Sequence, residues 1–285
     1  MSRNNLSRLG VADNASSDNP APQVTQNNTG FNFTAPTEMV ELPTKGKYYP
    51  EGHPLHNQKT VEIRYMTAKE EDILTSVSLI KNNLVIDRLL QSVMTDKRID
   101  PDYLFIGDKN ALIVATRITG YGPEYETQVI CPSCYSPSEH AFDLNDINLH
   151  EGGDALDSNV EETNEGTFII TLPMSQVRTE VRLLLGKDEK YLAQLANNKK
   201  KGNLPETPLT DQFKRVIVSV NGVRDRSSID RFVDNMPARD SRFLRKTYSK
   251  IVPGLDMNFA FDCPKCGSVS RIEVPLGPRF LWPSN

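Results

Sequence analysis

The sequence has no long hydrophobic run. Apolar stretches such as LVI at 84–86 and LLL at 183–185 fall far short of the roughly 20 residues that a membrane-spanning helix needs. The N-terminal stretch MSRNNLSRLGVADNASSDN also lacks the apolar core of a secretory signal. We therefore expect a protein that is made and kept in a reducing cytoplasm and that has no membrane partner.

Positive charge is in short supply. The chain has 33 lysines and arginines against 37 acidic residues, which gives a formal charge of -4 and a pI near 5.7. Proteins whose binding depends on phosphate contacts usually carry a surplus of basic residues. The deficit argues against an extensive nucleic-acid surface, although it leaves room for a local basic stripe.

The patterns that usually mark a catalytic site are missing as well. We find no paired nucleophile and base, no glycine-rich loop that would cradle a phosphate, and no set of carboxylates. His53 and His56 lie in a turn and not at i, i+4 on a helix, so they are a poor metal pair. We expect that the protein is not an enzyme.

Large apolar residues are scarce at the start of the chain. Residues 1–38 are rich in Asn, Ser, Gln and Pro. Such a segment buries too little apolar surface to offset the entropy lost on ordering. We therefore expect a disordered N-terminal arm over 1–38, followed by a single α+β domain over 39–285.

What the sequence does contain is two matched cysteine pairs. All four cysteines lie in CPSC (Cys131 and Cys134) and CPKC (Cys263 and Cys266). Each pair follows an alternating, strand-like segment and precedes another, which predicts two β-hairpins at about 124–145 and 256–276. Cytosolic cysteines at this spacing indicate metal binding or catalysis before structural disulfides.

Zinc is the metal that such a pattern favours. Two CPxC turns offer four thiolates in a tetrahedron, the closed shell of a structural zinc site that leaves no position for a reactive water. We predict a zinc-ribbon-like Zn²⁺ site whose ligands are Cys131, Cys134, Cys263 and Cys266. Gly267 suits a left-handed backbone after the second pair, whereas Tyr135 at the matching place is less comfortable.

Alternatives to this ligand set stay open. Isolated CxxC pairs can be redox-active or merely buried, although no thioredoxin-like context is present. His140 or His150 could replace a thiol, but a surface position is the simpler interpretation for each.

The segment between the hairpins, about 146–253, is predicted to be a mostly helical insertion. We expect a loop over 197–208, a helix capped by Thr210, and a last helix with its basic residues outward. The apolar face of the Thr210 helix would carry Phe213, Val216, Ile217 and Val220. Earlier in the chain, Thr67 and Glu70 form a capping-box pattern. A zinc ion joining the two hairpins would clamp the ends of the insertion together.

Several motifs, taken in order, resemble a known family. LPTKGKYYPEG, VEIRYMTAKEEDIL, LIKNNLVIDRLL, GYGPEY before CPSC, and CPKCG followed by PLGPRFLWP are similar to the baseplate hub subunit and hub-assembly proteins of T-even-like contractile-tailed bacteriophages. The likeness covers roughly residues 40–285. It implies a non-enzymatic structural or chaperone-like role, in the host cytoplasm during assembly or in the virion tail. Implied partners are other hub proteins, the tape-measure protein or tail tube components.

Two other functions compete with this one. A zinc-ribbon nucleic-acid or transcription module would use the cations of the last helix as a phosphate-facing stripe, namely Arg239, Arg242, Arg245, Lys246 and Lys250. A zinc enzyme would need three protein ligands and an exchangeable water.

Overall fold

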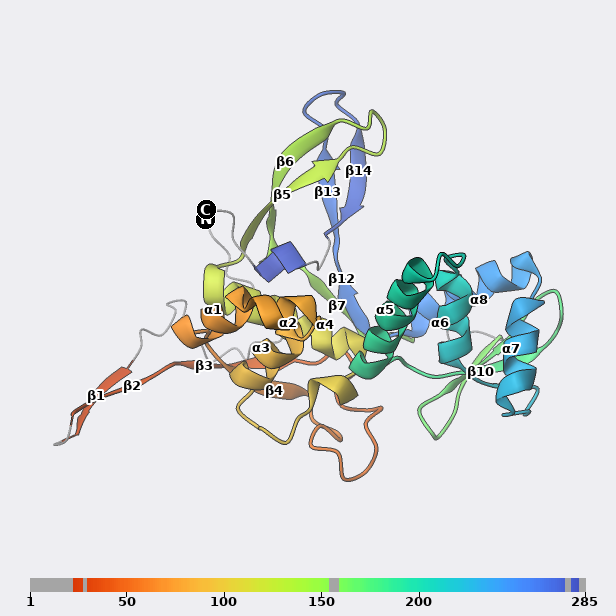
Figure 1. The fold of residues 1–285 in the computed structure, drawn as a ribbon, viewed down its shortest axis with the longest axis horizontal. Helices are drawn as coiled ribbons and strands as arrows, with labels where there is room; N and C mark the ends of the chain where they lie inside the picture. Colours follow the sequence, from red (N-terminus) through yellow and green to blue (C-terminus); the bar gives the residue numbers. More distant parts are fainter. Residues whose placement is uncertain (1–22, 28–29, 154–158, 275–277, 282–285) are drawn as a thin grey trace.

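The computed structural model describes residues 23–27, 30–153, 159–274 and 278–281. It is a mixed helix-and-sheet fold, as expected. The described part contains eight α-helices and several small antiparallel sheets. Two bodies lie end to end along the long axis, and a narrow arm projects from their junction (Figure 1).

The first body combines a two-stranded sheet with four helices. Strands β3 (Thr37–Glu41) and β4 (Thr60–Arg64) pair antiparallel, with Val40 opposite Val61. The helices follow as α1 (Ala68–Thr75), α2 (Val77–Lys81), α3 (Val85–Val93) and α4 (Ile106–Tyr121), with a short 3-10 turn, η2 (Pro101–Tyr103), before α4.

The predicted capping box at the start of α1 is confirmed. The Glu70 carboxylate accepts hydrogen bonds from the Thr67 N–H at 3.0 Å and from Arg64. Glu70 is fully buried, and its ion pair with Arg64 at 2.5 Å holds the charge there. Although burial alone would raise the pKa of Glu70, the hydrogen bonds from Arg64, Ser92 and Thr67 lower it to about 2.

The second body is the insertion. Its four-stranded antiparallel sheet has the order β11-β10-β9-β8, and the strands are β8 (Val160–Glu162), β9 (Phe168–Thr171), β10 (Arg178–Val181) and β11 (Ile217–Val220). Its helices are α5 (Gly186–Lys201), α6 (Pro208–Val216), α7 (Arg226–Asp234) and α8 (Ala238–Ile251). The cations predicted to point outward on α8 are all exposed.

Three details of the insertion differ from the sequence prediction. Residues 197–201, expected in a loop, are the last turn of α5. The residue that caps α6 is Thr207 and not Thr210, because Pro208 occupies the first helical position. Ile217 and Val220 belong to β11, which pairs with β10, and not to a helix, so the insertion is less helical than expected.

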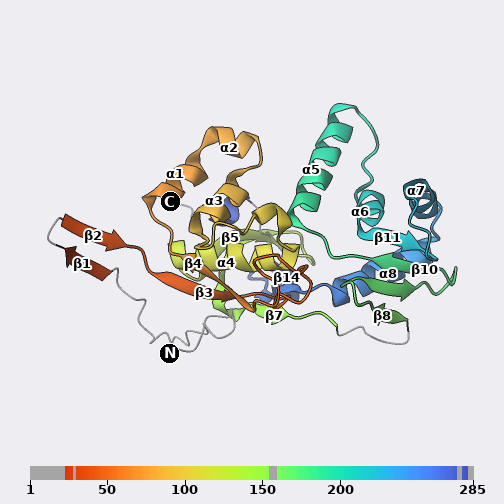
Figure 2. The ribbon, with the colours of Figure 1, turned by 90° about the horizontal axis from the view of Figure 1, so that it is seen from below.

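Each body has its own apolar core. One cluster of buried residues joins β3, β4, α3, α4, the arm and the C-terminal residues Phe280 and Leu281. The other joins the four-stranded sheet to α6, α7 and α8. Phe105, just before α4, contacts both clusters. The two cores therefore meet at the start of α4. Figure 2 shows the two bodies from below.

A buried carboxylate fixes the loop after β3 to this junction. Asp108 of α4 is fully buried and accepts hydrogen bonds from the Thr44 N–H at 3.0 Å, the Thr44 hydroxyl at 2.6 Å and the Tyr49 hydroxyl at 2.8 Å. The Phe105 N–H in turn donates to the Tyr49 oxygen. The motif LPTKGKYYPEG is thus anchored by the N-terminal turn of α4.

The segment expected to be a disordered arm falls partly outside the described residues, which begin at residue 23. In the described part, strands β1 (Gln23–Asn27) and β2 (Gly30–Thr34) pair as a hairpin. β3 begins at Thr37, slightly before the expected domain start at residue 39. At the other end, η4 (Pro278–Leu281) buries Phe280 against Tyr125 at a ring-centroid distance of 5.0 Å.

Candidate metal centre

The four cysteines lie at the tip of the arm. The first hairpin pairs β5 (Glu124–Ile130) with β6 (Pro137–Asp143), and the second pairs β13 (Asn258–Asp262) with β14 (Val269–Glu273). Each CPxC motif forms the turn of its hairpin. The arm, at the top of Figure 1, therefore contains both predicted hairpins side by side.

The arm is attached to the body by a second pairing between distant segments. η3 (Leu144–Asp146) and β7 (Asn148–His150) follow the first hairpin, and β12 (Gly254–Asp256) precedes the second. β7 and β12 pair antiparallel, with Leu149 opposite Leu255. The ends of the insertion thus meet at the base of the arm, so the polypeptide alone brings the two hairpins to the same place.

Aromatic side chains fill the space between the hairpins. Phe142 of β6 packs edge-on against Phe259 of β13 at 5.2 Å between ring centroids. His140 lies 4.6 Å from Phe142 and 5.4 Å from Phe261, again edge-on. Tilted and edge-on contacts of this kind stabilise a core beyond the area that they bury. The two turns that carry the cysteines are therefore held in a fixed relation by the arm itself.

The four sulfur atoms lie close enough together to hold one metal ion. All four Sγ atoms lie within 4.8 Å of one another. Cys131 is 3.8 Å from Cys266, and Cys134 is 3.7 Å from Cys263. A tetrahedron with metal–sulfur bonds of about 2.3 Å has edges of about 3.8 Å, whereas a disulfide needs about 2.05 Å. The donor set thus fits one thiolate-bound ion better than two disulfides.

Both turns are built in the same way. In the first, the Cys131 N–H donates to the Ser136 carbonyl and the Tyr135 N–H donates to the Cys131 carbonyl. In the second, the Cys263 N–H donates to the Ser268 carbonyl and the Gly267 N–H to the Cys263 carbonyl, at matching distances of 3.0 and 2.9 Å. The octapeptides CPSCYSPS and CPKCGSVS share the pattern C-P-x-C-x-S-x-S. This eight-residue repeat is a signal in the sequence that is missed when only the cysteines are considered.

The residue after the second cysteine is left-handed in both turns. Its φ is +56° at Tyr135 and +68° at Gly267. The backbone strain predicted for Tyr135 is therefore present, because a residue with a side chain loses roughly 1 kcal/mol or more in the left-handed conformation.

The electrostatics of the cluster favour a cation among the thiols. Hydrogen bonds from Ser136 lower the pKa of the Cys134 thiol to about 6, and the backbone N–H of Cys266 lowers that of Cys263. The Ser268 N–H also favours the Cys266 thiolate, but contacts with Cys134 and Cys263 raise the pKa of Cys266 to about 12. Ionisation of one sulfur thus opposes that of its neighbours, which a divalent cation would relieve.

The histidines do not join the cluster. His140 packs among the aromatic rings of the arm, and His150 contacts the Lys250 carbonyl at 2.9 Å. His53 stacks on Tyr49, and His56 contacts the Tyr49 carbonyl at 2.6 Å. Within the described residues, the four cysteines form the one group with metal-ligand geometry.

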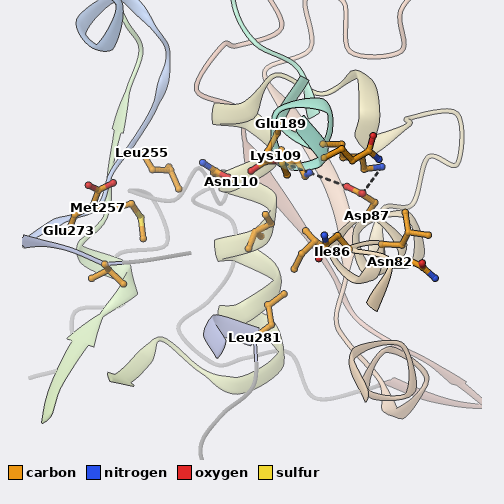
Figure 3. A pocket seen from close by; sticks show the side chains of 17 residues that line it. Asn82, Ile86, Asp87, Lys109, Asn110, Glu189, Leu255, Met257, Glu273 and Leu281 are labelled. Carbon is orange, nitrogen blue, oxygen red and sulfur yellow. Dashed lines mark hydrogen bonds and ion pairs between the residues drawn. The ribbon is translucent and has the colours of Figure 1, made fainter. Parts of the chain in front are cut away.

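A separate pocket of about 490 Å³ lies where the two bodies meet (Figure 3). Leu255, Met257 and Leu281 line the pocket, and Glu273 lies beside Met257. Lys109 pairs with Asp87 at 3.0 Å and with Glu189 at 3.1 Å. Because these charges already satisfy one another, the pocket offers no evident reactive group, and we assign it no ligand.

These features define a mixed helix-and-sheet protein with a four-thiol centre at the tip of a projecting arm. The chain belongs to the T4 bacteriophage base plate protein family, whose family model matches residues 36–280. Neither the curated proteins nor the solved structures include a match. In the described part of the chain, no helix combines the length and apolarity required to cross a membrane.

The family match confirms the resemblance to baseplate proteins. It supports a structural role in the phage baseplate, with other baseplate or tail components as partners and the virion tail as location. The match does not show that the protein belongs to the baseplate hub, and it does not support the nucleic-acid-binding alternative.

Proposed function

We propose that this protein is a non-enzymatic structural or assembly component of the baseplate hub and that a structural Zn²⁺ ion fixes its arm. The ligands would be Cys131, Cys134, Cys263 and Cys266. The observation that carries the proposal is the cluster of four sulfur atoms within 4.8 Å of one another in a chain that belongs to a baseplate family. With four protein ligands, the ion would have no open position for a reacting water.

The role of the ion would be to hold distant parts of the chain together. Cys134 and Cys263 are separated by 129 positions. Closing a loop of that length costs several kcal/mol, but the increase with length is slow. A structural zinc site supplies on the order of 10 kcal/mol, which exceeds that cost. Zinc would therefore clamp the ends of the insertion at the arm and make the protein a rigid block for assembly.

Recovery of the tagged protein from infected cells tests the assignment. Chemical cross-linking before purification, followed by mass spectrometry, should identify hub, tape-measure or tail tube proteins. Recovery mainly with DNA or polymerase, lost on nuclease treatment, would contradict a baseplate role.

The same experiment can test the metal. The Cys263→Ser variant removes one ligand, whereas Lys265→Ser changes an exposed residue of the same turn. We expect the first variant to lose both zinc and its tail partners and the second to retain both. Equal recovery of partners with both variants would show that binding to the tail partners does not depend on the metal.

A further inference from the structure

We propose that the end of the arm is the contact site for a recessed apolar surface on a different protein of the phage tail. This inference rests on the proposed function. We call the surface the apolar tip and define it as Ile130, Tyr135, Pro137 and Val269. All four are exposed, and each lies within three residues of a cysteine of the candidate metal centre.

The exposure of the tip is exceptional for this protein. Tyr135 is 78% exposed, Val269 74% and Ile130 65%, the three largest values among the exposed large hydrophobic residues of the described chain. Ile130 and Pro137 are also direct cross-strand partners in the first hairpin. Soluble proteins seldom gather apolar side chains on a projecting end unless another surface covers them.

The repeat within the arm shows that the fold does not require these side chains. In the matched turns, Tyr135 corresponds to Gly267, Ile130 to Asp262 and Val269 to Pro137. The second turn forms the same backbone hydrogen bonds with glycine and aspartate at the first two of these places. The apolar residues Ile130 and Tyr135 are therefore additions to a turn that forms without them.

Tyr135 carries the clearest sign of a role outside the fold. Its φ of +56° is strained for any residue with a side chain. Its ring makes no aromatic contact within the described part of the chain. A costly residue that packs on little inside the protein is a candidate for a contact with a partner.

The composition of the two turns indicates the chemistry of that partner. Over the matched ranges 130–137 and 262–269, the only charged side chains are Asp262 and Lys265, one of each sign. Serines surround the apolar residues, and the Ser133 and Ser268 hydroxyls, 2.8 Å apart, tie the two hairpins together. An aromatic anchor surrounded by a polar rim is typical of protein–protein interfaces.

The small size of the tip argues for a recess and against a second copy of this chain. A stable interface buries about 800 Å² on each partner, and a fully covered tyrosine contributes only about 200 Å². Two convex tips that meet cannot reach that area. A cavity that surrounds the end of the arm can, because the flanks of both hairpins then contribute as well, and Figure 1 shows that the arm stands clear of both bodies.

Site-specific photo-crosslinking in infected cells tests the proposal. The photoreactive residue p-benzoylphenylalanine is placed at position 135 and, as a control, at position 77 on α2, where Val77 is 63% exposed. We expect a single crosslinked tail protein from position 135 and none from position 77. Adding Ile130→Asp and Val269→Ser should lower the crosslink yield at least about 5-fold, whereas adding Val77→Asp should change it less than 2-fold. Zinc content and melting temperature verify that each variant is folded.

The outcomes distinguish the inference from the proposed function. If the protein is recovered with tail proteins but position 135 crosslinks to a second copy, to lipid or to nothing, the inference is wrong and the proposed function stands. If the unmodified protein is not recovered with tail proteins at all, the proposed function fails and the inference fails with it.

Discussion

The Sγ atoms of Cys134 and Cys263 lie 3.7 Å apart although 129 positions separate them in the chain. The turns that carry them have the same hydrogen bonds, and the strands behind them share an aromatic core. The pairing of β7 with β12 brings the two hairpins together. A metal ion would therefore complete an arrangement that the polypeptide already favours.

Metal analysis of the purified protein gives the first prediction. We expect about one zinc per chain, because four thiolates at tetrahedral spacing form a closed zinc site. In urea unfolding, Cys263→Ser should lower the free energy of unfolding by several kcal/mol, and Lys265→Ser should leave it within about 0.5 kcal/mol. A fully folded chain that contains no zinc, or a Cys263→Ser variant that melts like the parent, would rule out a structural zinc ion that holds the two hairpins together.

The second prediction concerns the left-handed residue of each turn. Tyr135→Gly removes a penalty of roughly 1 kcal/mol but adds a similar entropy cost of folding, so stability should change by less than about 0.5 kcal/mol. Gly267→Val introduces a larger penalty, because positive φ is especially unfavourable for a β-branched residue. It should destabilise by about 1–2 kcal/mol in spite of the entropy gain, although no atom lies within 4 Å of the added Cβ. Equal effects of the two substitutions in urea unfolding would contradict this backbone explanation.

The third prediction is a pH dependence due to Asp108. Burial, opposed by hydrogen bonds from Thr44 and Tyr49, raises the pKa of Asp108 to about 6 from a usual value of 3.8. Between these values the folded state keeps a proton that the unfolded state releases. The stability that this proton contributes is complete below about pH 4 and is lost as the pH rises through about 6.

Asp108→Asn should remove this dependence. The free energy of unfolding of the parent, relative to the variant, should fall by roughly 3 kcal/mol between pH 4 and pH 7. Urea unfolding at several pH values measures the difference, and Asp262→Asn, at an exposed position, is the control. A constant difference across this range would mean that Asp108 is ionised throughout.

The fourth prediction concerns where the stable part of the chain begins. β1 and β2 pair with each other, whereas β3 pairs with β4 and buries Val40. Deleting residues 1–36 should therefore leave the melting temperature nearly unchanged. Deleting residues 1–41 removes β3 and should cost several kcal/mol, since a buried strand is lost. A large loss in calorimetry after the shorter deletion would show that residues 1–36 pack on the domain.

The errors that sequence-based prediction made in the insertion have identifiable causes. The spacing of Phe213, Val216, Ile217 and Val220 fits one face of a helix, but Val220 pairs with Thr179 of β10. The β-branched residues at 217, 218 and 220 fit a strand equally well. Residues 217–220 form a strand and not a helix because an edge of the sheet is available for pairing. No local pattern in the sequence shows that this edge is available.

The lysine run shows a similar limit. Lys199, Lys200 and Lys201 were expected in a solvated loop, yet they form the last turn of α5, where cations stabilise the helix dipole. Lys199 also pairs with Asp211 of α6 at 2.5 Å. That contact depends on how α5 and α6 pack, which the composition of the segment does not reveal.

The sequence by itself determined the two hairpins and the cap of α1, because each depends on neighbours within a few positions, and the two matched CPxC pairs indicated which four residues would cluster. Only the tertiary structure decided that the hairpins share one arm, that β11 joins the strands of the insertion in one four-stranded sheet, and that Ile130, Tyr135 and Val269 stay uncovered. Those features depend on contacts between residues far apart in the chain, and local backbone preference carries no information about which distant surfaces meet.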